Sequence, residues 1–272
     1  MPQFEMIEVR PGIRIAVEAR QPSNSRLPHA GFMWLGGFKS DMTGTKATYL
    51  RDQAWRDGRP FIRFDYSGHG LSEGRFEDGT ISHWLEEAQM ALDLAEGFPM
   101  VLIGSSMGGY LALLLARRKI GSIKGLVLVA PAADMTQALM EPQIAANEEA
   151  RIAIARDGVW LRPSQYGEPY PITRKLIEDG RKHLILGEGV DVECPVRILH
   201  GERDPDVPWE HGLAIYRAIR STDIQFTLIK GGDHRLSRTN DMWAIHSAAE
   251  GVAIAAAERH GHPQFGAEPP EP

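Results

Sequence analysis

The sequence predicts an α/β fold with a mostly parallel central sheet and helices on both of its faces. Short apolar segments alternate with helical segments of about 10–15 residues, which is the pattern of βαβ units. The runs MVLI and LVLV are apolar at every position, as is typical of strands covered on both faces. With 272 residues, 43% of them hydrophobic and 24% charged, the chain can bury a large core without disulfides or metals.

The predicted elements follow one another in a regular order. The first is a hairpin, because residues 4–10 and 13–19 alternate in polarity on either side of the turn Pro11-Gly12. Short apolar runs predict the remaining strands at 31–35, 60–64, 100–103, 126–129, 196–199 and 224–230. Helical spacing of apolar residues predicts the helices at 43–57, 80–96, 107–118, 209–220 and 239–259.

Residues 132–192 interrupt this alternation. They contain helical stretches but no convincing strand, and their middle part, WLRPSQYGEPYPI, is rich in aromatic residues and proline. We therefore expect a helical cap insert over the sheet edge of a core formed by residues 1–131 and 193–260. Residues 261–272 are expected to form a flexible tail.

The motif G-x-S-x-G occurs at residues 104–108, directly between a predicted strand and a predicted helix. A serine at its centre sits on a strained strand-to-helix turn, where its hydroxyl is exposed at the sheet edge. This context predicts that Ser106 is a nucleophile, whereas Ser105 lies off the centre of the motif. The alternative interpretation is a glycine turn with an idle serine.

A serine hydroxyl needs a base, usually a histidine that a carboxylate orients. After such a motif the expected chain order is Ser, then Asp or Glu, then His. Among the ten histidines, His234 follows the last predicted strand and precedes the last predicted helix, so we expect it to be the base. His211 falls inside a predicted helix, and His69 precedes the nucleophile in a glycine-rich loop.

The acid is chosen among carboxylates in the segment HGERDPDVP, which follows a predicted strand. Asp204 is preferred, because it lies past the turn from which a side chain can return toward His234. Asp206 remains the alternative. Asp233 is adjacent to His234 in sequence, and a bond between neighbouring side chains has poor geometry.

Acyl transfer also requires two hydrogen-bond donors aimed at the oxyanion. We expect one to be the backbone N–H of Met107, directly after the nucleophile, and the other to be the N–H of Phe38 in the loop after an early strand. Gly37 would let that loop approach closely. The alternative is that the two glycines before Phe38 only form a turn.

With these motifs in order, the sequence resembles the α/β-hydrolase superfamily over about residues 4–260, through LGGFKSD, DYSGHGLS, GSSMGG, LHGERDPDVP and GGDH. The strings GFKSDMTGTKA, RFDYSGHGLSEG, CPVRILHGERDPDVPW and GGDHR are more specifically similar to the mitochondrial palmitoyl-protein thioesterase family, which also cleaves acyl glucuronides. The resemblance implies the α/β-hydrolase fold and a triad of Ser106, Asp204 and His234. It also implies activity on fatty-acid thioesters or on esters of xenobiotic acids.

The sequence therefore predicts a serine hydrolase that cleaves carboxylic esters or acyl thioesters through an acyl-serine intermediate. The alternatives are perhydrolysis, carbon–carbon cleavage or amide cleavage by the same triad, or a binding protein without catalysis. Four side chains of the insert are candidates to line an acyl channel, or equally to form the core of the cap: Trp160, Leu161, Tyr166 and Tyr170.

Composition also narrows the expected partners. A net charge of −6 without a basic stripe does not favour nucleic acid, and no residue cluster at ligand spacing predicts a metal or other cofactor. No run approaches the ~18 apolar residues of a membrane span. The N-terminus has neither an apolar signal segment nor an Arg-rich transit segment, and Cys194 is the single cysteine. We expect a small-molecule ester as substrate and the cytoplasm as location, with the oligomeric state left open.

Overall fold

The computed structural model describes residues 4–20, 30–164 and 167–259. Within these ranges the main sheet has eight strands in the order β1-β2-β4-β3-β5-β6-β9-β10. The strands are β1 (Glu5–Arg10), β2 (Ile13–Arg20), β3 (Gly31–Leu35), β4 (Phe61–Phe64), β5 (Met100–Ser105), β6 (Ile123–Val129), β9 (Val196–Gly201) and β10 (Ile224–Ile229). β2 pairs antiparallel with β1 and β4, and every other pairing in this sheet is parallel.

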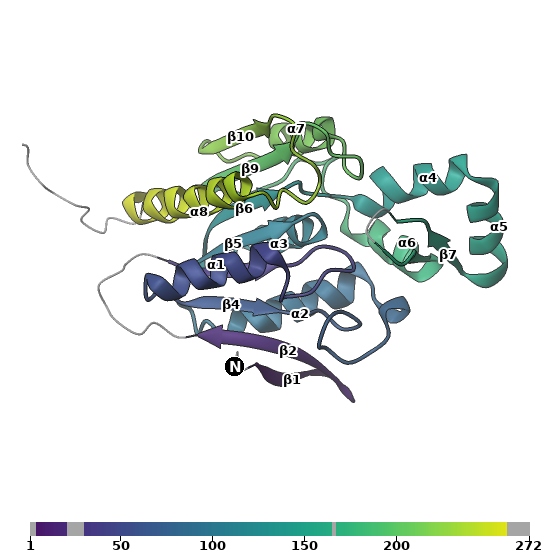
Figure 1. Cartoon of the computed structure of the whole chain (residues 1–272), viewed down its shortest axis with the longest axis horizontal. Helices are drawn as coiled ribbons and strands as arrows, with labels where there is room; N and C mark the ends of the chain where they lie inside the picture. The colour runs from purple at the N-terminus through teal and green to yellow at the C-terminus, as the bar shows by residue number, and fades with distance from the viewer. Residues whose placement is uncertain (1–3, 21–29, 165–166, 260–272) are drawn as a thin grey trace, which may run out of the picture.

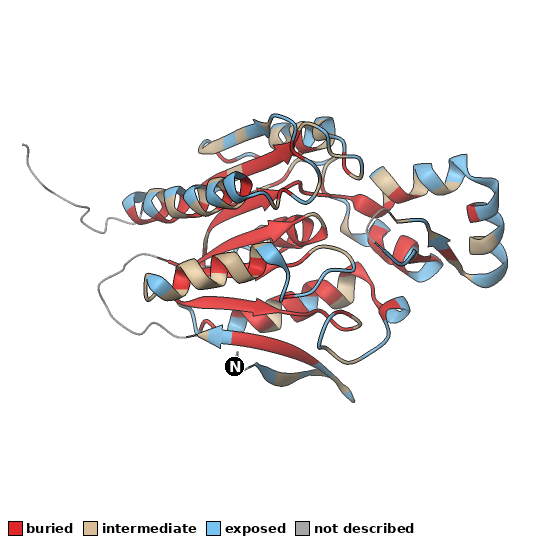
Figure 2. Ribbon diagram, viewed as in Figure 1, coloured by how far each residue is buried: buried red, intermediate tan, exposed pale blue. Residues whose placement is uncertain are grey.

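Helices cover both faces of the sheet (Figure 1). Side chains alternate across each strand. Accordingly, Phe32 and Trp34 of β3 pack in one hydrophobic cluster with α1 (Thr45–Arg56) and α8 (Thr239–Arg259). Met33 and Leu35 belong to the other cluster, with α2 (Ile81–Asp93), α3 (Met107–Arg117) and α7 (Trp209–Ala218). Figure 2 shows the resulting continuous burial of the central strands. The predicted α/β class is confirmed.

The cap insert lies beyond the carboxyl ends of the parallel strands (Figure 1). It contains η2 (Thr136–Met140), α4 (Glu141–Ala146), α5 (Glu148–Asp157), β7 (Val159–Arg162), β8 (Tyr170–Thr173), α6 (Arg174–Gly180) and η3 (Arg181–His183). The prediction of an insert without strands was wrong for β7 and β8, which pair antiparallel. Each is four residues long and β8 contains Pro171, so neither offers the alternating run by which a strand is recognised.

Hydrogen bonds hold the cap to α2. The backbone N–H and the hydroxyl of Ser82 each donate to the carboxylate of Asp179 in α6, both at 2.8 Å. Burial raises the pKa of this carboxyl, but the bonds from Ser82 and Lys182 outweigh it, so the pKa lies below its usual range. From the core, the Tyr110 hydroxyl donates to the carbonyl of His183 at 2.6 Å. These bonds fix the base of the cap next to the carboxyl edge of the sheet.

Candidate active site

The turn between β5 and α3 carries Ser106 in a strained conformation. Its φ of 54° and ψ of −116° lie outside the regions that a residue with a side chain ordinarily adopts. Glycines on both sides make the turn possible. A Cβ on Gly104 would lie 2.3 Å from the carbonyl oxygen of Gly108, and one on Gly108 would lie 2.1 Å from the carbonyl oxygen of Leu35. The two glycines of the G-x-S-x-G motif are therefore needed because the backbone at this turn leaves no room for a Cβ atom at either position.

The structure joins Ser106, His234 and Asp204 by a chain of hydrogen bonds. Nδ1 of His234 lies 2.7 Å from Oδ2 of Asp204, and Nε2 of His234 lies 3.1 Å from Oγ of Ser106. An ionised carboxylate can only accept, so Nδ1 carries the proton and Nε2 is free to accept the serine proton. His234 lies between β10 and α8, and Asp204 follows β9. Three distant chain segments thus meet in one chain of hydrogen bonds.

Asp204 is held from several sides. Its Oδ1 accepts the backbone N–H groups of Asp206 at 2.9 Å and Val207 at 2.8 Å. Burial raises the pKa of this carboxyl, but hydrogen bonds from His200, His234 and Val207 outweigh it and hold the pKa well below its usual range. Asp204 is therefore ionised at neutral pH.

His200 is a neighbour of the acid that the sequence reasoning did not identify. Its side chain is fully buried, with Nε2 3.4 Å from Oδ2 of Asp204 and 2.9 Å from the carbonyl oxygen of Val207. The only available signal was its place at the start of HGERD, four residues before Asp204. Asp206, the alternative acid, instead turns toward the cavity, and its buried Oδ2 has no hydrogen-bond partner among the described residues.

The loop after β3 lies directly against the serine turn. A Cβ on Gly37 would be 3.4 Å from Cβ of Ser106, so the next residue, Phe38, is close to the nucleophile. Met107 is the first residue of α3, and the first N–H groups of a helix have no partner inside it. Both predicted oxyanion donors therefore belong to segments that border Ser106.

A cavity of about 460 Å³ opens beside Ser106 and His234. Its volume is within the usual range for small-molecule sites. The cap contributes an apolar wall that consists of Ala132, Met135, Leu139, Met140 and Tyr170. Charged side chains also border it: Lys39, Asp41, Lys46, Arg162, Glu168, Asp206 and Arg235. The sequence reasoning missed three of these residues. Their only signal was their helical spacing in the segment after β6: Met135, Leu139 and Met140.

The four predicted cap residues lie in different places. Tyr170 lines the cavity, and its ring packs edge-on against Phe38 with 6.0 Å between centroids. Trp160 is 8% exposed and belongs to the hydrophobic core, while Leu161 is 61% exposed. Neither is among the described residues that line the cavity: the two lie on opposite faces of β7, with Trp160 packed into the hydrophobic core and Leu161 turned toward solvent. Tyr166 lies outside the described residues.

Two groups of described residues bring three metal-ligand atoms within 4.8 Å of one another: Asp204, Asp206 and His234, and Asp57, His246 and Glu250. In the first group, Asp204 and His234 already bond to each other. In the second, Glu250 pairs with the guanidinium of Arg59 at 2.6 Å. We assign a metal to neither. Across the described ranges, no helix has the length and apolar character needed to cross a membrane.

The sequence is also similar to that of known proteins. A family model described as "Serine aminopeptidase, S33" matches residues 44–175. The mitochondrial palmitoyl-protein thioesterase ABHD10 of Bos taurus is 37% identical over 217 residues, which span 78% of this chain and 69% of the relative.

Solved structures are similar over nearly the whole chain. A protein from Agrobacterium vitis S4 with a provisional hydrolase assignment has a TM-score of 0.86 and 41% identity, covering 92% of this chain and 98% of its own. Alpha/beta hydrolase domain-containing protein 10 from mouse has a TM-score of 0.81 and 30% identity, covering 93% of this chain and 98% of its own. The chain therefore belongs to the α/β-hydrolase superfamily of serine hydrolases, in the family of the palmitoyl-protein thioesterase ABHD10.

Proposed function

We propose that this serine hydrolase cleaves fatty-acyl thioesters and carboxylic esters through an acyl-Ser106 intermediate. The observation that carries the proposal is the position of the Ser106 hydroxyl, 3.1 Å from Nε2 of His234 and on the border of an apolar-walled cavity. The thioesterase names of relatives that share 35–37% identity support the choice of substrate.

The proposed reaction begins when Nε2 of His234 accepts the proton of Ser106 as its oxygen attacks the acyl carbon. The N–H groups of Met107 and Phe38 stabilise the oxyanion. His234 then donates its proton to the leaving sulfur or oxygen, and the alcohol or thiol departs. His234 then deprotonates a water molecule, which attacks the acyl carbon; the bond between this carbon and Oγ of Ser106 breaks, His234 returns the proton to Oγ, and the carboxylic acid leaves. Asp204 holds the imidazole in its tautomer and stabilises its charged form.

The acyl chain is proposed to lie along the apolar cap wall. Tyr170 supplies a flat ring next to Phe38, and Met135 and Met140 supply side chains that adapt to chains of different length. Among the charged residues on the border, Lys39, Asp41 and Glu168 are exposed to water and would face the leaving group.

The nucleophile is tested by labelling with a fluorophosphonate probe. The wild-type protein is expected to be labelled and Ser106→Ala is expected to lose both labelling and esterase activity. Ser105→Ala is the matched control, because it removes the neighbouring hydroxyl and should keep the label. Undiminished labelling of Ser106→Ala would overturn the proposal.

The substrate class is tested by a series of acyl p-nitrophenyl esters and acyl thioesters, from acetyl to palmitoyl. Both leaving groups should be accepted. Amide cleavage is the second candidate, because the matching family model is described as a serine aminopeptidase. If aminoacyl p-nitroanilides are cleaved faster than all esters and thioesters, amide cleavage replaces ester cleavage as the function.

The proposed location is the cytoplasm, whose reducing environment fits a chain with one cysteine. The curated relatives bear mitochondrial names. Fractionation of cells of the source organism, with detection by an antibody against the native protein, tests the location. Recovery in a membrane-bound compartment would contradict it.

A further inference from the structure

Two buried side chains anchor the oxyanion loop, defined here as residues 37–42. Oδ1 of Asp65 accepts the N–H of Met42 at 2.6 Å, and Nε2 of His69 accepts the N–H of Lys39 at 3.1 Å. The other oxygen of Asp65 accepts the N–H of Leu71 at 2.8 Å, so the carboxylate joins two loops. His69 is 3% exposed and is not among the residues that line the cavity, so its ring does not meet the substrate.

The contacts of His69 are consistent with one neutral tautomer. Nδ1 lies 3.2 Å from the carbonyl oxygen of Ser67, which can only accept, so Nδ1 carries the proton. Nε2 then has a lone pair for the N–H of Lys39. Burial lowers the pKa of His69 to about 4, so the ring keeps this acceptor at neutral pH. If the ring were protonated, its Nε2–H would point at the backbone N–H of Lys39, and two donors would face each other with no acceptor between them.

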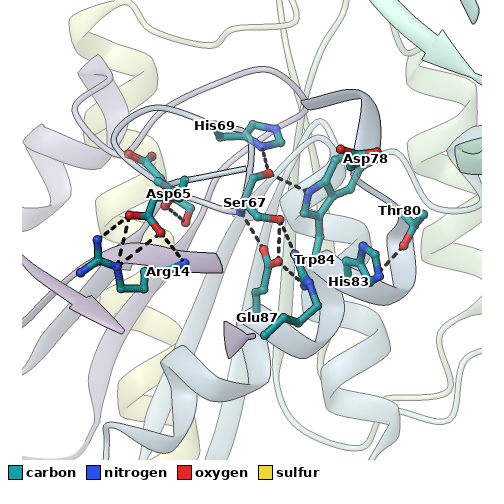
Figure 3. Close-up of polar contacts among 12 residues, drawn as sticks. Arg14, Asp65, Ser67, His69, Asp78, Thr80, His83, Trp84 and Glu87 are labelled. Atoms are coloured by element: carbon teal, nitrogen blue, oxygen red, sulfur yellow. Dashed lines mark hydrogen bonds and ion pairs between the residues drawn. The ribbon is translucent and has the colours of Figure 1, made fainter. Parts of the chain in front are cut away.

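Neighbouring residues fix the orientation of the ring (Figure 3). The carbonyl of Ser67 also accepts the indole N–H of Trp84 at 3.3 Å. The N–H and the hydroxyl of Ser67 donate to the fully buried carboxylate of Glu87 at 2.8 and 2.6 Å. The ring of His69 also packs against Phe76 and Trp84, with centroids 4.9 and 5.3 Å away. These contacts leave the imidazole little freedom to turn away from Lys39.

The bond to Lys39 constrains the residue that supplies the oxyanion donor. Lys39 has a φ of 60°, in the left-handed region that a lysine rarely adopts. One peptide plane joins the carbonyl of Phe38 to the N–H of Lys39, so the bond to His69 holds this plane. The N–H of Phe38 belongs to the preceding plane, whose Gly37 carbonyl accepts the N–H and the hydroxyl of Ser40 at 3.1 and 2.8 Å. The planes on both sides of Phe38 are therefore held, and His69 holds the second of them. A strained conformation persists where surrounding contacts hold it, and the bond from His69 is a contact of this kind for Lys39.

We propose that His69 is a positioning residue for the oxyanion hole: by holding the N–H of Lys39, its Nε2 keeps the N–H of Phe38 aimed at the reacting carbonyl. This inference rests on the proposed function, since it assumes that Phe38 is an oxyanion donor. Its expected effect is on the transition state, where the oxyanion forms, and not on ground-state binding of the ester.

The test compares His69→Asn with His69→Gln. The asparagine amide reaches the position of Nδ1 but not that of Nε2, whereas the glutamine amide reaches far enough to accept the N–H of Lys39. We expect His69→Asn to lower kcat by about 10- to 100-fold, less than the roughly 100- to 1000-fold loss when an oxyanion donor is removed outright, because the N–H of Phe38 is misplaced and not deleted; KM should be nearly unchanged. His69→Gln should restore most of kcat. His246→Asn is the control, because that ring also packs edge-on against an aromatic side chain, Tyr49, but lies on α8.

A transition-state analogue separates positioning from a general structural role. A trifluoromethyl ketone forms an oxyanion on the serine, so its inhibition constant for His69→Asn should rise by the same factor as kcat/KM falls. His69→Phe, which keeps a ring but has no acceptor, repeats the measurement if His69→Asn does not fold. The inference is overturned if kcat is unchanged, if the inhibition constant does not move, or if His69→Gln is as impaired as His69→Asn. Activity that persists in Ser106→Ala would instead count against the proposed function.

Discussion

The carboxylate of Asp204 and the imidazole of His234 are joined by a hydrogen bond of 2.7 Å between Oδ2 and Nδ1. The other oxygen, Oδ1, is occupied by two backbone N–H groups, so the carboxylate cannot rotate without losing three bonds. Because these bonds hold the pKa of Asp204 below its usual range, the group stays ionised in mildly acidic solution. This pairing distinguishes Asp204 from Asp206, which is only two residues away.

Replacing the acid should therefore affect catalysis far more than replacing its neighbour. We expect Asp204→Asn to lower kcat by about 10⁴-fold, since an amide can stabilise the wrong imidazole tautomer. Asp206→Asn is the matched control and should keep kcat within about tenfold. Steady-state kinetics with a p-nitrophenyl ester measures both. If Asp206→Asn lowers kcat more than Asp204→Asn does, Asp206 and not Asp204 is the acid of the triad.

Truncating the cap wall should change the recognition of long acyl chains. Tyr170→Ala removes a ring that lines the cavity, and we expect KM for palmitoyl esters to rise about tenfold, with a smaller change for acetyl esters. Leu161→Ala, in the paired strand but exposed, should leave both KM values unchanged. Equal effects of Tyr170→Ala on acetyl and palmitoyl esters would mean that the acyl chain lies elsewhere.

Two glycine substitutions should have opposite effects on stability. Gly108→Ala sets a Cβ 2.1 Å from the backbone oxygen of Leu35, so the free energy of unfolding should fall by at least about 2 kcal/mol. Gly251 lies in α8, where no atom of the described residues comes within 4 Å of an added Cβ, and Gly251→Ala should raise the free energy of unfolding by about 0.5–1 kcal/mol. Urea denaturation measures both. A neutral Gly108→Ala would argue against the close packing at the serine turn.

Acid should destabilise the fold partly through His69. Its pKa is about 4 in the fold, against about 6.5 in the unfolded chain. Between these values the unfolded chain binds more protons, so the free energy of unfolding increases with pH across that window, by about 3 kcal/mol in total for this group. Urea denaturation at several pH values should show a flatter slope for His69→Asn than for the wild type. Parallel slopes would mean that folding does not lower the pKa of His69.

Patterns within short stretches of the sequence were enough to predict most of the strands and helices of this fold. Apolar runs and helical spacing predicted all eight strands of the main sheet and the five helices that cover it, because strand and helix periodicities are written within a few consecutive residues. Ser106 and His234 could be singled out for the same reason. Each lies at a strand-to-helix junction that is visible in the chain itself, in GSSMGG and GGDH.

Contacts between distant segments decide the rest. The chain pattern favoured Asp204 but left Asp206 as an alternative, and it is the approach of His234 from the β10–α8 loop that separates the two. Likewise, β7 and β8 are too short to be recognised before they pair, and tertiary packing decides that Trp160 enters the hydrophobic core while Leu161 faces solvent. Hydrogen bonding and packing across the chain, unlike periodicity, depend on how the backbone is arranged in space, so these features are determined only by the tertiary structure.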